Sequence, residues 1–158
     1  MLDTRTNMDA LHCAACREAF PPGSFRKHAK TCAWCTYASK TKRAKARYRD
    51  KQKAPKARLN ITLDEFVAWY EVQADECAYC GLTFAELKAL RIKRGGGYCV
   101  AWDIDRLDSA RPYEPGNLAL SCFVCNMAKG DLLNADEARL IGKTIRGIWR
   151  ARLARAGV

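Results

Sequence analysis

Two aspartates alternate along the segment AWDIDRLD, residues 101 to 108, and Asp105 is followed at once by Arg106. Residues two apart in a strand face the same side, so Asp103 and Asp105 would share one face. A carboxylate at Asp105 and an amide at Asn126 are hard oxygen ligands suited to Mg²⁺. A guanidinium beside them can hold a phosphate oxygen. The pattern predicts metal-assisted chemistry on a phosphate.

The base for such chemistry is less evident. Arg106 stays protonated and cannot accept a proton from water. The chain has only two histidines, His12 and His28. Both lie far from Asp105 in the sequence, so neither is well placed.

Tyrosine is the other option, and we favour Tyr79. A nearby cation and Arg106 would lower its pKa and favour the phenolate. Tyr98 is a weaker candidate, because it precedes Asp105 by seven positions, which span roughly 23 Å in an extended strand. Ordinary packing is the alternative role for either tyrosine. Asp103 is a further candidate to bind the metal or orient water.

Eight of the nine cysteines form Cys-x-x-Cys pairs, and Cys99 is left over. Two such pairs can hold one tetrahedral zinc ion, and clustered cysteines in a reducing compartment indicate metal rather than disulfides. We expect two structural zinc sites, the first at Cys13, Cys16, Cys32 and Cys35, and the second at Cys77, Cys80, Cys122 and Cys125. Each such site carries a net charge of −2, which reduces the formal charge of +11 to about +7.

Residues 40–58 contain ten Lys or Arg and one Asp. The segment could simply be a solvated helix or linker. However, so many like charges repel one another unless a polyanion binds them, and nucleic-acid phosphate is the expected polyanion. Pro55 would end any helix here. The expected DNA-binding residues are Lys42, Arg43, Lys45, Arg47 and Arg49.

Other elements would position the site. Capping boxes at Thr62/Glu65 and Thr83/Glu86 predict two short helices. Residues 98–104 and 117–122 predict paired strands, followed by a helix from about Asn126. The Cys122/Cys125 pair would hold the start of this helix against the Cys77/Cys80 pair.

A longer helix is predicted after Asn134 and Glu137, which form a third capping box. Its apolar face would pack on its own core or on a second subunit. That face comprises Leu140, Ile141, Ile145, Trp149 and Leu153. The other side is basic, with Arg139, Lys143, Arg146, Arg150 and Arg152.

In their order along residues 12–150, four segments resemble the HNH endonucleases, or ββα-metal (His-Me finger) nucleases. These segments are CAYCG, DIDRLD, GNLAL and CFVCNMAKGD. The resemblance implies that Asp105 and Asn126 bind the catalytic metal and that Asn117 holds the loop in shape. The family's usual general-base histidine would follow the aspartate, where this chain has Arg106. A member of this family has a similar Asp-Arg pair. We therefore interpret Arg106 as part of a variant active site and not as the mark of an inactive one.

The expected fold is a small zinc-stabilised α+β protein, in which an N-terminal four-cysteine zinc ribbon precedes a ββα-metal core with flanking helices. We divide it into residues 1–39 (zinc module), 40–60 (DNA-contacting segment) and 61–158 (nuclease core).

The expected function is an Mg²⁺- or Mn²⁺-dependent endodeoxyribonuclease, a phosphodiester hydrolase that cuts double-stranded DNA as a restriction-type homodimer. The alternatives are a phage or homing-type nicking nuclease and a non-catalytic zinc DNA-binding regulator. The sequence has no apolar run long enough to span a membrane and no secretory signal pattern, so we expect a cytoplasmic protein of bacterial or phage origin.

Overall fold

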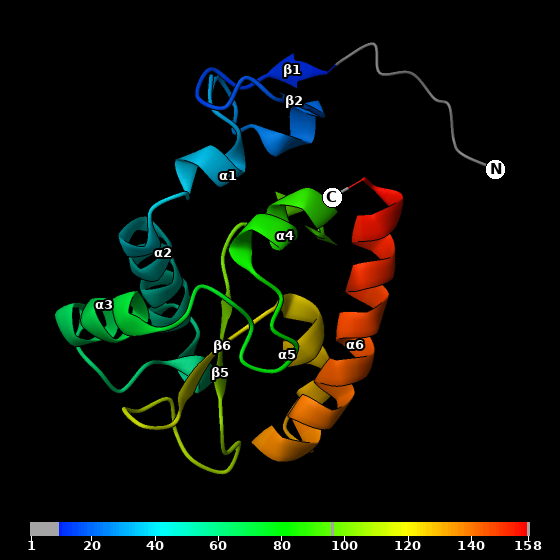
Figure 1. Cartoon of the computed structure of the whole chain (residues 1–158). Helices are drawn as coiled ribbons and strands as arrows, with labels where there is room; N and C mark the ends of the chain where they lie inside the picture. The colour runs from blue at the N-terminus through cyan, green and yellow to red at the C-terminus, as the bar shows by residue number, and fades with distance from the viewer. Residues whose placement is uncertain (1–9, 96, 158) are drawn as a thin grey trace.

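Three small antiparallel sheets, each of two strands, and a set of surrounding helices make up the described residues, 10–95 and 97–157, of the computed structural model (Figure 1). The fold is α+β, with two four-cysteine groups that could hold zinc. The first nine residues of the expected 1–39 zinc module lie outside the described residues.

The N-terminal module is built around its own small core. Its elements are β1 (Leu11–His12), β2 (Ala19–Phe20), the 3₁₀ turn η2 (Pro22–Ser24) and α1 (Ala33–Thr36). Phe20 stacks on Trp34 with ring centroids 5.3 Å apart, and Tyr98 of β4 (Gly97–Tyr98) lies 4.9 Å from Trp34. Apolar packing therefore joins this module to the rest of the chain.

The basic segment forms α2 (Lys40–Gln52), which ends before the 3₁₀ turn η3 (Pro55–Ala57). Helix α3 (Leu63–Val72) packs beside it (Figure 1) and begins at the expected Thr62/Glu65 capping box. Ala44, Phe66 and Tyr70 are buried between them and the main core. The basic helix is thus anchored along one side.

Helix α4 (Phe84–Leu90) begins at the expected Thr83/Glu86 capping box. The predicted strand over 98–104 is only partly correct: β3 (Lys93–Arg94) pairs with β4 (Gly97–Tyr98), and the next strand starts at Asp103. The interval is not a strand because the carbonyls of Ala101 and Trp102 accept hydrogen bonds from Arg47 instead of from a neighbouring strand.

The central unit consists of β5 (Asp103–Arg106), β6 (Leu118–Ser121) and α5 (Phe123–Lys129). Asp103 pairs with Ser121 and Asp105 with Ala119 across the antiparallel strands. The helix begins three residues earlier than expected, because Cys122 caps it by accepting a hydrogen bond from the Cys125 amide.

Helix α6 (Ala135–Arg155) begins at the expected Asn134/Glu137 box and packs on α4 and α5 (Figure 1). Ile145, Trp149 and Leu153 of the predicted apolar face are buried in the protein's own core. Leu140 and Ile141 of that face are exposed instead, together with Ile148. Across residues 10–95 and 97–157, the helices lack the length and apolar character of a membrane span.

Candidate active site

Asp103 and Asp105 lie on the same face of β5, as the strand alternation predicts, and α5 packs beside that strand. Both carboxylates are 8% exposed. Burying a carboxylate is costly unless it is paired and hydrogen-bonded. The partners of each aspartate therefore define the chemistry of the site.

Asp105 is held between a phenol and an ammonium group. The hydroxyl of Tyr79 donates a hydrogen bond of 2.5 Å to its Oδ2, and Nζ of Lys129 lies 3.5 Å from the same oxygen. The Lys129 side chain is fully buried and also donates to Oγ of Ser109 at 2.9 Å. The Asp105 carboxylate is therefore held in one place by side chains from two other parts of the chain.

The pKa of Tyr79 is raised, first by burial and then by its hydrogen bond to Asp105. The expectation of a lowered pKa for Tyr79 is therefore wrong. The guanidinium of Arg106 contacts Asp131 and the Tyr113 ring. The phenol keeps its proton and directs it at Asp105.

Asp103 is the centre of a separate network. Nη1 of Arg94 lies 2.8 and 2.9 Å from its two carboxylate oxygens, and Nη2 of Arg47 lies 3.3 Å from Oδ1. Asn126 donates from Nδ2 to Oδ2 of Asp103 at 3.2 Å. Two arginines already neutralise Asp103, which makes it a poorer cation ligand than Asp105.

The structure thus brings Asn126 to Asp103, and not into a hydrogen bond with Asp105. Asn126 is the fourth residue of α5 rather than its first, because the helix starts at Phe123. Its Nδ2 is engaged by Asp103, so Oδ1 is the atom through which this amide could bind a cation.

Arg106 extends from the end of β5. Its Nη2 is 2.7 Å from Oδ1 of Asp131, an exposed carboxylate, and its guanidinium lies 5.0 Å from the centre of the Tyr113 ring. An ion pair with an exposed partner is weak, so Arg106 can exchange it for a phosphate.

Asn117 is almost fully buried and holds the loop between β5 and β6. Its amide accepts from the backbone N–H of Asp108 at 2.8 Å and donates to the carbonyls of Asp108 and Pro112. This geometry agrees with the loop-holding role expected for it.

A cleft of about 640 Å³ opens beside the network around Asp103. It lies between the N-terminal module, α2 and the segment that leads into β5. The charged and polar residues that line it include Arg47, Asp50, Lys51, Arg94, Asp103 and Asn126. The basic helix therefore forms one wall next to the candidate site.

Two of the expected DNA-binding residues have structural partners. Arg43 is 0% exposed, pairs with Asp75 at 2.6 Å and lies 3.9 Å from the centre of the Phe84 ring. Its prediction as a DNA contact is wrong, because the buried ion pair fixes it inside the protein. Arg47 is engaged by the network described above, whereas Lys42, Lys45 and Arg49 are exposed.

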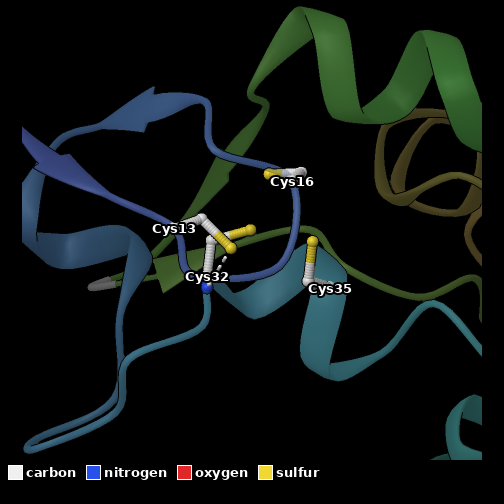
Figure 2. A group of neighbouring side chains, drawn as sticks. All are labelled: Cys13, Cys16, Cys32 and Cys35. Atoms are coloured by element: carbon white, nitrogen blue, oxygen red, sulfur yellow. Dashed lines mark hydrogen bonds between the residues drawn. The ribbon is translucent and has the colours of Figure 1, made fainter.

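The eight paired cysteines come together as predicted, in two groups of four. Within each group the four sulfur atoms lie within 4.8 Å of one another. Figure 2 shows Cys13 and Cys16, from the turn after β1, converging with Cys32 and Cys35, from the start of α1. The amide of Cys32 donates to Sγ of Cys13 at 3.2 Å. Four converging sulfurs are the donor set of a tetrahedral metal site.

The second group is fully buried and joins distant parts of the chain. It ties the turn containing Tyr79 to the start of α5, because its members are Cys77, Cys80, Cys122 and Cys125. Hydrogen bonds from the thiols of Cys122 and Cys125 lower the pKa of Cys77. A cysteine that readily becomes a thiolate suits metal binding. Cys99 is buried and belongs to neither group.

Three residues of the site were missed by reasoning from the sequence: Lys51, Arg94 and Lys129. Lys129 had a usable signal, because it follows Asn126 by three residues and so shares its helix face. Arg94 and Lys51 are brought to the site by tertiary packing, and their sequence spacing carries no such signal.

No protein-family model matches the chain, and no curated protein does. A solved structure of PacI, a rare-cutting HNH restriction endonuclease, is similar to it with a TM-score of 0.60 and 28% sequence identity. The similarity covers 90% of this chain and 97% of PacI. The fold thus resembles that of an HNH restriction endonuclease over nearly its whole length.

Proposed function

We propose that this chain is a metal-dependent DNA endonuclease of the HNH type. The observation that carries the proposal is the pairing of Asp105 with Tyr79 and Lys129 on a strand-strand-helix unit. The similarity to PacI, which extends over both chains, supports placing this arrangement among nucleases.

The residues at the site fit a hard divalent cation. Asp105 would hold Mg²⁺ or Mn²⁺ through its carboxylate, and Asn126 would add its amide oxygen. When bound, the ion would act as a Lewis acid toward the phosphate. The two four-cysteine groups suit Zn²⁺ in a structural role, because each offers four thiolates and no open position.

The chain's own residues would perform the rest of the hydrolysis. Tyr79 is the candidate general base: its phenol oxygen would take a proton from the attacking water while its own proton passes along the hydrogen bond to Oδ2 of Asp105. Water adds to phosphorus, the bond to the leaving oxygen breaks, and Arg106 offsets the negative charge that develops on the phosphate. Fixed positions of these groups favour attack along one direction.

We assign grip and cleavage to different parts of the chain. Residues 1–39 and the exposed cations of 40–60 would hold the duplex backbone, and residues 61–158 would cut it. Contacts through lysine and arginine to phosphates predict binding that weakens steeply with salt. The exposed residues of α2 that fit this role are Lys42, Lys45 and Arg49.

Cutting both strands at one place requires two active sites, so we propose a symmetric homodimer with palindromic targets. The exposed Leu140, Ile141 and Ile148 of α6 are candidates for the contact. Light scattering with and without DNA tests this. A monomer in both conditions would instead favour a nicking enzyme of the phage or homing type.

The deciding experiment is purified protein with plasmid DNA and Mg²⁺ or Mn²⁺. Asp105→Asn and Asn126→Ala should each abolish cutting while zinc content is retained. Asp64→Asn is the matched control, because Asp64 is exposed in the first turn of α3. Discrete linear products support a restriction-type enzyme and nicked circles a nicking enzyme. DNA that is bound but uncut by the wild type would favour a zinc-containing regulator.

A further inference from the structure

Lys51 is a cationic residue of the cleft that the mechanism above does not use. It lies in the last turn of α2 and lines the same cleft as Asp103 and Asn126. Its ammonium nitrogen is 3.7 Å from the centre of the Tyr113 ring. Arg106 contacts that same ring at 5.0 Å. One aromatic ring therefore holds a cation from α2 next to a cation from β5.

Tyr113 is itself firmly placed. Its carbonyl accepts a hydrogen bond of 2.7 Å from the backbone N–H of Asn60, and its backbone forms a bridge with Leu59. The tip of the loop between β5 and β6 is thereby fastened to the chain that leaves α2. Because the Tyr113 backbone is fixed in this way, its ring sets the position of Lys51 relative to Arg106.

The surroundings of Lys51 favour an anionic ligand. Burial lowers its pKa to about 8, although Asp103 and Asp105 oppose this. Asp103 is already paired with Arg94 and Arg47, and Asp50 of the same helix lies 3.8 Å from Arg47. The charged and titratable groups around Lys51 are Arg47 on α2, Asp103, Asp105 and Arg106 on β5, and Tyr113 on the loop.

We propose that Lys51 contacts a non-bridging oxygen of the phosphate that is cleaved, beside Arg106, with Tyr113 as the residue that positions both. The assignment rests on the proposed nuclease function. The α2 helix then has a role beyond holding the duplex, because its last turn would complete the phosphate site built by β5. At neutral pH the ammonium is protonated and offsets charge that develops on the phosphate.

The test compares Lys51→Met with Lys51→Arg in single-turnover cleavage at saturating protein. Losing one donor to the reacting phosphate should slow cleavage by Lys51→Met by roughly 100- to 1000-fold. Lys51→Arg should recover most of the rate, because it restores the charge. Lys143→Met removes one exposed lysine from α6 and should cleave at the wild-type rate. Zinc content and melting temperature show that each variant is folded.

The pH profile separates this role from plain packing on Tyr113. The pH dependence of kcat/KM reports the pKa values of groups in the free enzyme. For the wild type, kcat/KM should fall above about pH 8, where Lys51 loses its proton, and for Lys51→Arg it should not. An active wild type with Lys51→Met as fast as Lys143→Met would overturn the assignment and leave the nuclease function intact. A wild type that cuts no DNA would overturn the nuclease function and the assignment with it.

Discussion

Gly142 of α6 lies directly against the carbonyl of Tyr79: a Cβ at this glycine would be 2.2 Å from the Tyr79 oxygen and 2.6 Å from its carbonyl carbon. Both contacts are to backbone, which cannot swing aside. The long C-terminal helix thus supports the turn that presents the Tyr79 hydroxyl to Asp105.

We expect Gly142→Ala to destabilise the protein by about 1–3 kcal/mol, because the methyl group forces α6 away from the turn. Cleavage should fall as well, since Tyr79 would move with its backbone. Gly147→Ala is the control on the same helix, where a Cβ meets nothing within 4 Å. That change should stabilise the helix by about 0.5–1 kcal/mol. Thermal unfolding and plasmid cleavage measure both effects, and equal behaviour of the two variants would contradict the close contact.

The two tyrosines considered as general base make different contacts in the fold. Tyr79→Phe removes the hydroxyl that faces Asp105, so we expect cleavage to fall by roughly 100-fold or more with DNA affinity unchanged. Tyr98→Phe should retain activity, because its ring packs 4.9 Å from Trp34. Single-turnover rates and anisotropy with labelled DNA distinguish them. A larger loss for Tyr98→Phe would move the assignment to the cleft beside the N-terminal module.

Local sequence patterns predict much of this fold. The three capping boxes at Thr62, Thr83 and Asn134 start helices where expected, because their hydrogen bonds involve residues only three apart. The cysteine groups also follow from short spacings. Strand β5, which contains Asp105, pairs with β6, which starts directly after Asn117, and this agrees with the expected β-β-α order.

The errors arise where tertiary contacts override local preference. Residues 99–102 are apolar enough for a strand, yet Arg47 from α2 binds the carbonyls of Ala101 and Trp102. Arg43 belongs to a run of basic residues, which predicts an exposed side chain, yet it is buried against Asp75 and Phe84. Neither contact has a signal in the sequence, because the partners are more than 30 residues apart.

Lys129 compensates the charge of Asp105 from a fully buried position. Lys129→Met leaves that carboxylate with one partner fewer, and removing one member of a buried pair typically costs about 3–5 kcal/mol. A divalent cation bound by Asp105 would replace part of the lost positive charge. We therefore expect Ca²⁺ to raise the melting temperature of Lys129→Met more than that of the wild type. An equal shift in both proteins would argue against a cation site at Asp105.

The two cysteine groups should differ in what they support. Cys77→Ser breaks the fully buried group that joins the Tyr79 turn to α5. We therefore expect the main core to unfold and the proposed cleavage to be lost, since metal binding contributes folding energy. Cys16→Ser should lose one zinc ion and weaken DNA binding while the main core still melts cooperatively, because Cys16 lies in the N-terminal module. Cys99→Ala is the matched control outside both groups and should keep two zinc ions per chain. Metal analysis with thermal unfolding by circular dichroism checks all three. If Cys77→Ser kept two zinc ions and a folded core, the second group would not be the brace of the site.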